Sequence, residues 1–460
     1  MASKNSTPTP EAPEHTHSGA EKTVHLSRRS FIAITGFSVL LGATPGIVNS
    51  FVPKPWTYDW KPFGRVTSAE EAAAAVLKYA AESVEDGSNG VGGMIIHNET
   101  GVIVQHGSNT RFKPVDFHVV TGPKQTFTWD YTAHGETGLV MWYQANQKAL
   151  GLPPASECTI VTSLDPCAMC TGSILTAGFQ AAVVAFDPTG GMNLDTQGNY
   201  NTLPASLRPI AQSTFGFYAV NGGRAYQGGQ KVPFKADSIK PTTEKACGDV
   251  FFDSRTEIKN MSVDKEVKLS QLQNPATLPA TSPLRVMMKE QFPDAFSLTL
   301  ANYRKPDAKL KEYLVNLNKN TPGSKNAVAL IDPFGNLIAA SADRFDIGSA
   351  YTAYMNTVRQ YALFRYAAYN KEASKAEATN HLTAPEYGTV VWLHAPSPGL
   401  PSTVKDIGAY ATATGTKTGG NFFYYEAPLT GTIEGLIEEI SILPPYYTVD
   451  TKIDPQKVVL

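Results

Sequence analysis

Hydrophobic and polar positions along the first half of the chain predict helices and strands in alternation. An Ala- and Glu-rich stretch behind Ser68 has the N-cap and acidic first turn of a helix. Short apolar runs separated by a turn containing Gly101 predict a β-hairpin. The expected elements are a helix at 68–84, a hairpin at 93–104, a helix at 134–150, a strand at 159–162, a helix starting within 165–172 and a strand at 181–186. Such alternation is typical of an α/β layered domain.

The same order of elements returns in residues 286–460, which predicts a second copy of the domain. An amphipathic helix is expected at 307–318, and a hairpin follows it at 326–340. Residues 351–357 overlay 131–137 with four of seven positions identical. The alternative is an unrelated α/β domain with the same common order of elements.

Composition narrows the class of protein. Lys and Arg number 39 and Asp and Glu 41, so 39 − 41 gives a net charge of −2. This balance argues against a nucleic-acid binder that relies on a large basic surface. With 42% hydrophobic residues the chain can bury sizeable cores. Four cysteines exclude a disulfide-dense scaffold. We expect Cys158 to be a small buried residue and Cys247 to lie in a polar linker.

The first 50 residues have the pattern of an export signal. Residues 1–26 are polar and without periodicity, which predicts a disordered tail. The sequence SRRSF at 27–31 then precedes a weakly apolar run that small and polar residues interrupt. This pattern resembles a twin-arginine signal, which implies a periplasmic or secreted protein without stable membrane insertion. The alternative is a chance arginine pair before a core helix.

Four residues of the first half could form a metal site with a neighbouring carboxylate. Cys167 and Cys170 are three positions apart at an expected helix start, where the helix dipole stabilises thiolates. His134, at another expected helix start, could be a third ligand. One nitrogen and two sulfur donors suit Zn²⁺ and leave one position for water. Glu136 could take a proton from that water without binding the metal.

These residues carry a resemblance to a known family. HGE at 134–136 and PCAMC at 166–170 resemble the zinc-dependent cytidine/deoxycytidylate deaminase superfamily, particularly its cytosine, guanine and tRNA-adenosine deaminase branch. The resemblance implies a three-layer α-β-α domain with a mixed sheet and a bound Zn²⁺. The implied site residues are His134, Cys167 and Cys170 as zinc ligands, Glu136 as proton shuttle and Asn109 as a base contact.

The residues expected around the pocket do not identify the substrate. The insertion at 113–130 is longer than is usual in these families and lies on the approach to the expected pocket. Asn109 could instead be an ordinary turn residue. Phe112, Trp129 and Tyr131 could stack on a flat base or simply pack in the core.

The alignment of the two halves predicts that the second has lost its metal. The aligned pairs are His134 with Tyr354, Glu136 with Asn356, Cys167 with Ser397, and Cys170 with Leu400. The expected organisation is a tail and signal at 1–50, a zinc-dependent deaminase domain at 51–255, a linker at 256–285 and a degenerate deaminase-like domain at 286–460. Because subunits of this superfamily commonly pair, the second domain could replace a homodimer partner and wall the pocket.

The expected function is hydrolytic deamination of a nucleobase, nucleoside or similar aminated heterocycle. Zinc-bound hydroxide would attack the ring carbon and ammonia would leave, which is hydrolysis of a C–N bond in a cyclic amidine. No nucleic acid is expected as a partner. The alternatives are a non-catalytic ligand-binding protein with a structural zinc, and a secreted deaminase toxin that acts on nucleic acid.

Overall fold

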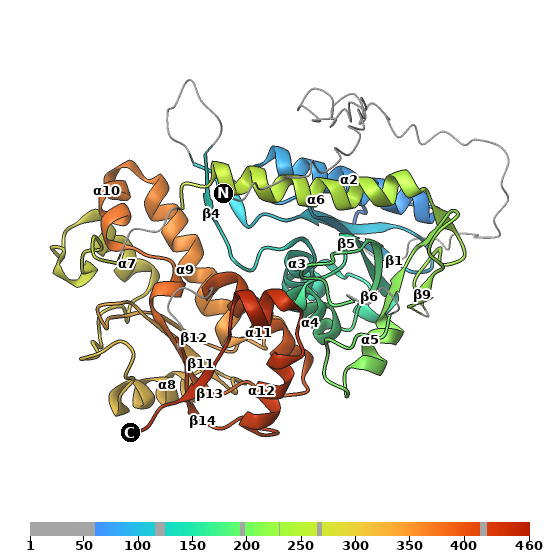
Figure 1. Ribbon diagram of the computed structural model, residues 1–460. Coiled ribbons are helices and arrows are strands. Elements are labelled where there is room, and N and C mark those ends of the chain that lie inside the picture. The colour runs from blue at the N-terminus through green and yellow to red at the C-terminus, as the bar shows by residue number, and fades with distance from the viewer. Residues whose placement is uncertain (1–59, 116–124, 194–197, 230, 265–268, 415–420) are drawn as a thin grey trace, which may run out of the picture. The chain divides into compact units, whose positions relative to one another are not determined.

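Two mixed β-sheets with the same strand order form the framework of the protein (Figure 1). The structure, a computed structural model, describes residues 60–115, 125–193, 198–229, 231–264, 269–414 and 421–460. Contacts divide the chain into residues 1–49 and 50–460, and the described residues all belong to the second unit. The expected tail and export signal therefore lie outside the described residues.

The structure contains the predicted helices and strands in the expected order, together with further elements that the hydrophobic pattern did not indicate. The α-helices are α2 (Ala69–Glu85), α3 (Gly135–Leu150), α4 (Ala168–Ala177), α5 (Arg208–Thr214), α6 (Pro241–Met261), α7 (Pro283–Gln291), α8 (Ala308–Asn320), α9 (Ala353–Asn370), α10 (Glu372–His381), α11 (Pro401–Thr414) and α12 (Ile433–Ser441). Short helical turns are η1 (Ala155–Glu157), η2 (Pro275–Thr277), η3 (Pro385–Tyr387) and η4 (Tyr446–Asp450). Ser68 caps α2 by accepting a hydrogen bond from the backbone N–H of Glu71.

The strands fall into two large sheets and two small ones. The first sheet has the order β2-β1-β5-β6-β7-β9 and the second β12-β11-β13-β14-β15. In both, the first two pairings are antiparallel and the next two parallel. The strands are β1 (Gly92–His97), β2 (Ile103–Ser108), β3 (Phe112–Pro114), β4 (Thr126–Thr128), β5 (Cys158–Leu164), β6 (Gln180–Ala185), β7 (Phe215–Phe217), β8 (Ala219–Val220), β9 (Gln227–Gly228), β10 (Ser238–Ile239), β11 (Ala327–Ile331), β12 (Leu337–Ala342), β13 (Thr389–His394), β14 (Phe422–Glu426) and β15 (Pro455–Lys457).

The hairpin turns of the two halves match in backbone detail. Gly101 and Gly335 both have positive φ, at 67° and 87°. Each accepts a backbone hydrogen bond from the residue that it approaches, Val66 at 2.9 Å and Leu300 at 2.8 Å. A Cβ at either glycine would lie 2.1–2.2 Å from that residue's carbonyl oxygen, so only glycine fits. The expected α/β class with a tandem second half is confirmed by this shared architecture.

The structure departs from the expected organisation in two places. Six residues separate β13 from α11, against three between β5 and α4, so the overlay of Cys167 on Ser397 does not continue into the helix. Helix α6 runs to Met261, through the expected boundary between 255 and 256. Its sequence is polar because much of its surface is exposed, which is why it read as trailing elements and linker. The domain boundaries themselves stay a prediction.

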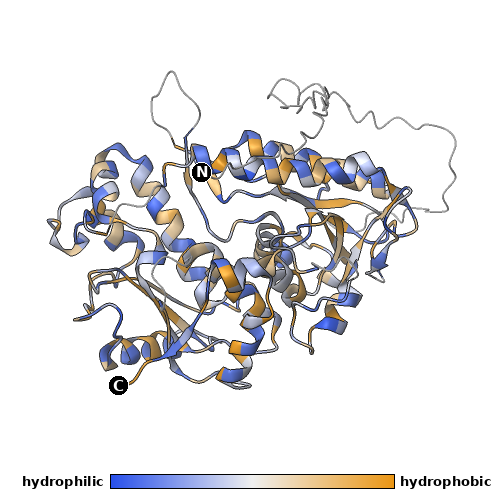
Figure 2. Cartoon of the chain, viewed as in Figure 1, coloured by the Kyte–Doolittle hydropathy of each residue, from blue (hydrophilic) through white to orange (hydrophobic). Residues whose placement is uncertain are grey.

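Helices cover both faces of each sheet. Helices α2 and α6 share a core with one face of the first sheet, and hydrophobic residues alternate with polar ones along both helices (Figure 2). Helix α8 covers one face of the second sheet in the same way. The remaining faces meet in a single continuous core that includes Ile160 and Met169 from the first half and Trp392 and Tyr410 from the second. The two halves therefore share their largest hydrophobic interior.

Helices α4 and α11 cross at two glycines in this shared core. A Cβ at Gly172 would lie 2.4 Å from the backbone nitrogen of Lys405, and one at Gly408 would lie 2.1 Å from that of Met169. Backbone therefore touches backbone at the crossing, directly behind the Cys-x-x-Cys motif. Within the described residues, no helix combines the length and apolar character that crossing a membrane requires.

Candidate metal and catalytic site

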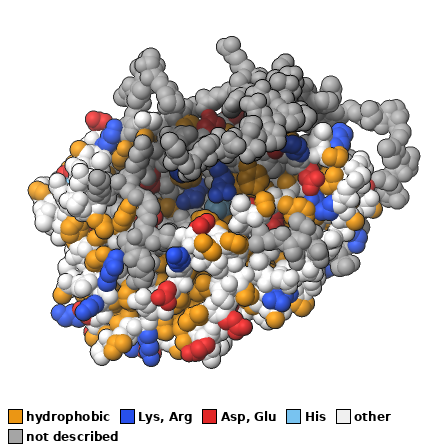
Figure 3. All heavy atoms as spheres, viewed as in Figure 1, with side chains coloured by type: hydrophobic (Ala, Val, Ile, Leu, Met, Phe, Trp, Pro, Cys, Tyr) orange, Lys and Arg blue, Asp and Glu red, His pale blue; other side chains and the backbone are white. Residues whose placement is uncertain are grey.

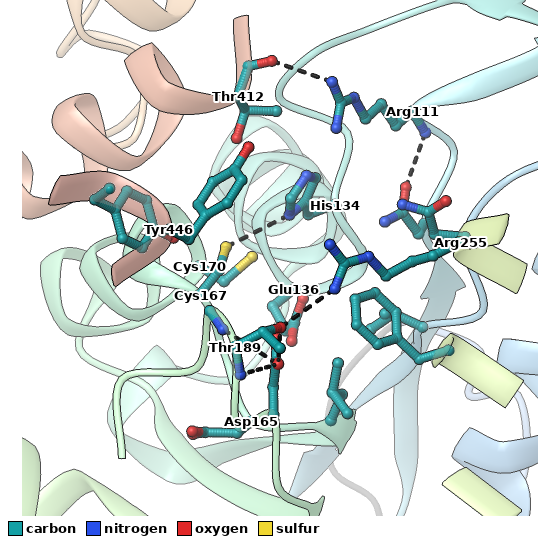
Figure 4. A pocket seen from close by; sticks show the side chains of 18 residues that line it. Arg111, His134, Glu136, Asp165, Cys167, Cys170, Thr189, Arg255, Thr412 and Tyr446 are labelled. Carbon is teal, nitrogen blue, oxygen red and sulfur yellow. Dashed lines mark hydrogen bonds between the residues drawn. The ribbon is translucent and has the colours of Figure 1, made fainter. Parts of the chain in front are cut away.

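Three side chains from two helix starts converge on one point. His134 is the N-cap of α3 and Cys167 is the N-cap of α4, with Cys170 one turn further. Their ligand atoms all lie within 4.8 Å of one another, and Figure 4 shows them facing a common space. The structure thus brings together the three residues that the sequence motif predicts as ligands.

The donor set fits zinc. Nδ1 of His134 lies 3.5 Å from Sγ of Cys167. Bonds of about 2.3 Å to sulfur and about 2.0 Å to nitrogen at a tetrahedral angle place these atoms about 3.5 Å apart. The pKa of the Cys167 thiol is lowered well below its usual range, chiefly by a hydrogen bond from Cys170. Among the described residues the group contains these three donors, so a tetrahedral ion would keep one open position.

Glu136 lies in the same pocket, in the first turn of α3. Its side chain is 3% exposed, and its Oε1 accepts a hydrogen bond of 2.7 Å from Oγ1 of Thr162 on β5. Burial, followed by the nearby Cys167, raises the pKa of this carboxyl. A buried carboxylate with a raised pKa is suited to accept and return a proton beside the metal.

Comparison with known families agrees with this arrangement. Residues 66–186 match the family model for the cytidine and deoxycytidylate deaminase zinc-binding region. Zn²⁺ is the cofactor of this region, and the convergence of His134, Cys167 and Cys170 provides a place for it. The match supports a zinc-dependent deaminase in general.

Two solved structures are similar to parts of this chain. The chain is similar to the guanine deaminase from Nitrosomonas europaea at 15% identity and a TM-score of 0.25, covering 46% of this chain and 100% of that one. It is also similar to a structure from studies of A-to-I editing by tRNA:A34 deaminases, at 22% identity and a TM-score of 0.20, covering 26% of this chain and 80% of that one.

Asn109 lines the same pocket of the deaminase-type region. It is buried, and its Oδ1 accepts hydrogen bonds from Oγ of Ser88 and the backbone N–H of Arg111. These two donors fix the amide, so its Nδ2 is the part that can face a ligand. The position is consistent with a base contact, and that role stays a prediction.

Residues other than the predicted ligands, Glu136 and Asn109 complete the pocket walls. Asp165 accepts a hydrogen bond from the backbone N–H of Asn193 and packs against Gly191, which holds the loop after β6 in place. From this loop, Thr189 reaches the pocket. On the opposite side Arg255 enters from α6. No local motif marks Arg255, because it reaches the pocket through the packing of α6.

The second half contributes directly to the pocket of the first. Thr412, Tyr446 and Tyr447 line it together with the zinc motif (Figure 4). The hydroxyl oxygen of Tyr447 accepts a hydrogen bond of 3.0 Å from the backbone N–H of Ala168, between the two cysteines. Residues of the second half therefore wall the pocket and support the Cys-x-x-Cys turn.

Removal of the Tyr447 hydroxyl should weaken zinc binding. Tyr447→Phe leaves the buried N–H of Ala168 without its acceptor, so the turn that orients both thiolates is held less firmly. We expect the affinity for zinc to fall by about 10–100-fold, as for other residues that orient metal ligands. Competition with a chromogenic chelator measures this. Tyr446→Phe is the matched control, and equal zinc affinity in both variants would contradict the role of Tyr447.

Aromatic side chains fill the corresponding place in the second half. Tyr354 stacks on Trp392 with ring centroids 5.0 Å apart, and Trp392 stacks on Phe422 at 3.9 Å. Asn356 donates to the backbone carbonyls of Ala342 and Tyr351. Within the described residues of this half, no group of three metal donors occurs. The second half is thus degenerate at the metal site.

The other aromatic residues and cysteines that the sequence singled out lie outside the zinc pocket. Trp129 lies under the ammonium of Lys113, 3.5 Å from its ring centroid. Phe112 and Tyr131 line a second cavity next to the zinc pocket rather than the pocket itself. Cys158 is a buried free thiol, as expected, and Cys247 is likewise buried and free, within α6 rather than in a linker.

Proposed function

We propose that the protein is a hydrolytic deaminase acting on the exocyclic amino group of a nucleobase, nucleoside or similar heterocycle. The observation that carries this proposal is the buried Glu136 in one pocket with three metal donors. A structural zinc site needs no carboxylate beside it and is normally completed by a fourth Cys or His. Neither Cys158 nor Cys247 belongs to the group, which favours an enzyme over a non-catalytic binding protein.

Each residue has a role in this chemistry. His134, Cys167 and Cys170 would hold zinc, which when bound lowers the pKa of water toward neutrality. Glu136 takes a proton from water and passes it to the ring nitrogen as the water oxygen bonds to the ring carbon. It then carries the remaining hydroxyl proton to the amine, whose C–N bond breaks as ammonia leaves. Thr162 holds the carboxylate by its hydrogen bond throughout. Water and the aminated ring are consumed, and the oxo-substituted ring and ammonia are formed.

Location and assembly are part of the same proposal. The twin-arginine pattern at 27–31 supports export to the periplasm or beyond. Residues of the second half line the pocket, which supports the proposal that no homodimer partner is needed to complete it. The near-neutral net charge supports a small molecule rather than nucleic acid as the substrate.

A substrate screen tests the proposal. The zinc-loaded protein is incubated with bases, nucleosides, nucleotides, pterins and single-stranded oligonucleotides, and ammonia release is measured. We expect release from at least one small aminated ring, and its loss after zinc is removed by a chelator. Release from oligonucleotides alone would favour the toxin, whereas no release from any ring would favour the binding protein.

A further inference from the structure

A second, larger cavity opens directly from the zinc pocket. The inner cavity, which holds the metal donors, has a volume of about 130 Å³, and the outer one has about 670 Å³. Pockets for small ligands usually measure roughly 300–1,000 Å³. The volume of the outer cavity lies within this range, and the volume of the inner cavity lies below it. The geometry therefore suits a ligand that places a ring at the metal and extends into the outer cavity.

Two arginines stand where the cavities meet. Arg111 and Arg255 line both cavities, together with Asn89 and Thr412. In Figure 4 the Arg255 guanidinium extends toward Glu136 and the Arg111 guanidinium toward Thr412. Figure 3 shows Lys and Arg side chains gathered at a hollow of the surface that also contains a histidine. A ligand passing between the cavities would pass both guanidinium groups.

Neither arginine forms an ion pair or a hydrogen bond with a carboxylate among the described residues, although the charge of Glu386 acts on Arg111 from further away. Arg111 donates from Nη2 to the carbonyl oxygen of Thr412 at 3.1 Å, and its buried Nε has no hydrogen-bond partner. Arg255 donates from Nη1 to the hydroxyl of Thr189 at 3.2 Å. By contrast, Arg365 in the outer cavity is paired with Asp264 at 2.7 Å. The two junction guanidiniums thus keep their capacity for an anionic ligand, which such groups bind strongly.

One face of α6 extends the positive charge into the outer cavity. Arg255, Ile258, Lys259 and Ser262 follow one another along this face and all line the outer cavity. Two carboxyl groups are also present there. Asp264 forms an ion pair with Arg365. Burial, followed by the nearby Asp264, raises the pKa of Glu386 to about 7, while Arg365 and Arg111 act in the opposite direction. The uncompensated charge along this path is therefore mainly positive.

We propose that the substrate is an aminated ring bearing a phosphate or carboxylate substituent, which Arg111 and Arg255 bind at the junction of the two cavities. This inference rests on the proposed function and narrows its substrate class. The ring occupies the inner cavity beside Glu136, and its substituent lies along α6. Free bases lack the group that the two arginines bind, so they are the poorer substrates.

Matched pairs of substrates test this inference. The value of kcat/KM is measured for a nucleoside and its 5′-monophosphate, and for a pterin and its 6-carboxylate, so the two arms distinguish phosphate from carboxylate. We expect the anionic member of at least one pair to be favoured by roughly 10–100-fold, the range of hydrogen bonds to charged groups. The ratio should fall toward one in Arg255→Gln, where the replaced side chain is exposed, and should be unchanged in Arg304→Gln, an exposed arginine of the second half.

A binding measurement separates the inference from the proposed function. Wild-type protein and Arg255→Gln are titrated by calorimetry with the same neutral and anionic pairs. Stronger binding of the anionic member, lost in the variant, supports the junction site even if no ring releases ammonia. Turnover of neutral rings without any gain from an anionic substituent would overturn the inference and leave the proposed function standing.

Discussion

Glu136→Gln should reduce the rate of ammonia release by about 10²–10⁴-fold, the range for loss of a positioned acid–base group. Glutamine has nearly the same shape and can still meet the Thr162 hydroxyl, but it cannot carry a proton from water to the ring and the leaving amine. Because Glu136 is not among the three metal donors, zinc should remain bound. The test pairs the rate of ammonia release with zinc content by elemental analysis.

The control for this variant is Glu82→Gln, an exposed glutamate on α2. It should retain both the rate and the zinc content of the wild type. If Glu136→Gln kept most of its activity with zinc fully bound, another group would have to be the proton shuttle. If it lost zinc, the carboxylate would belong to the metal site rather than to the reaction.

Gly408→Ala should destabilise the protein although it lies in the half without metal. The added Cβ would lie 2.1 Å from the backbone nitrogen of Met169, so α11 must move away from α4. Overpacking of this kind costs about 1–3 kcal/mol. Because Met169 lies between Cys167 and Cys170, we also expect a lower zinc content. Urea denaturation and elemental analysis measure the two effects.

Gly248→Ala is a matched control within α6. It too replaces a glycine inside a helix, but a Cβ there has no neighbouring atom within 4 Å. Alanine favours a helix over glycine by about 1 kcal/mol, so this variant should be as stable as the wild type or slightly more stable. If both alanine variants raised the free energy of unfolding, the backbone contact between α4 and α11 would not exist as described.

Local sequence patterns were sufficient to predict the three metal donors and Glu136, all of which lie in the first half of the chain. Ser68 marked the start of α2, and the two motifs lie at the starts of α3 and α4 as expected. The ligands could be found from sequence because a helix start fixes the direction of its first side chains. The second sheet was predictable for a related reason, since a buried strand such as β13 keeps its apolar run even where the metal ligands are lost.

The rest of the pocket could not be predicted in this way. Tyr447 is 279 positions from Ala168, which donates a hydrogen bond to it, and nothing in its neighbourhood of the sequence indicates the contact. Arg255 lies on α6, whose polar sequence resembles that of a linker. The insertion at 113–130 was expected on the approach to the pocket, and its described part places Thr128 on the outer cavity. Such positions depend on how whole elements pack.

The distance along the chain between Ala168 and Tyr447 also bears on biosynthesis. The zinc motif leaves the ribosome first, while the tyrosine that supports it and the glycine at the helix crossing follow 279 and about 240 positions later. Until then the shared interior lacks more than half of its buried side chains, so the nascent chain exposes apolar surface where α4 will meet α11. We therefore expect the metal centre to reach its full affinity for zinc only after the second half of the chain has been synthesised and has packed against the first.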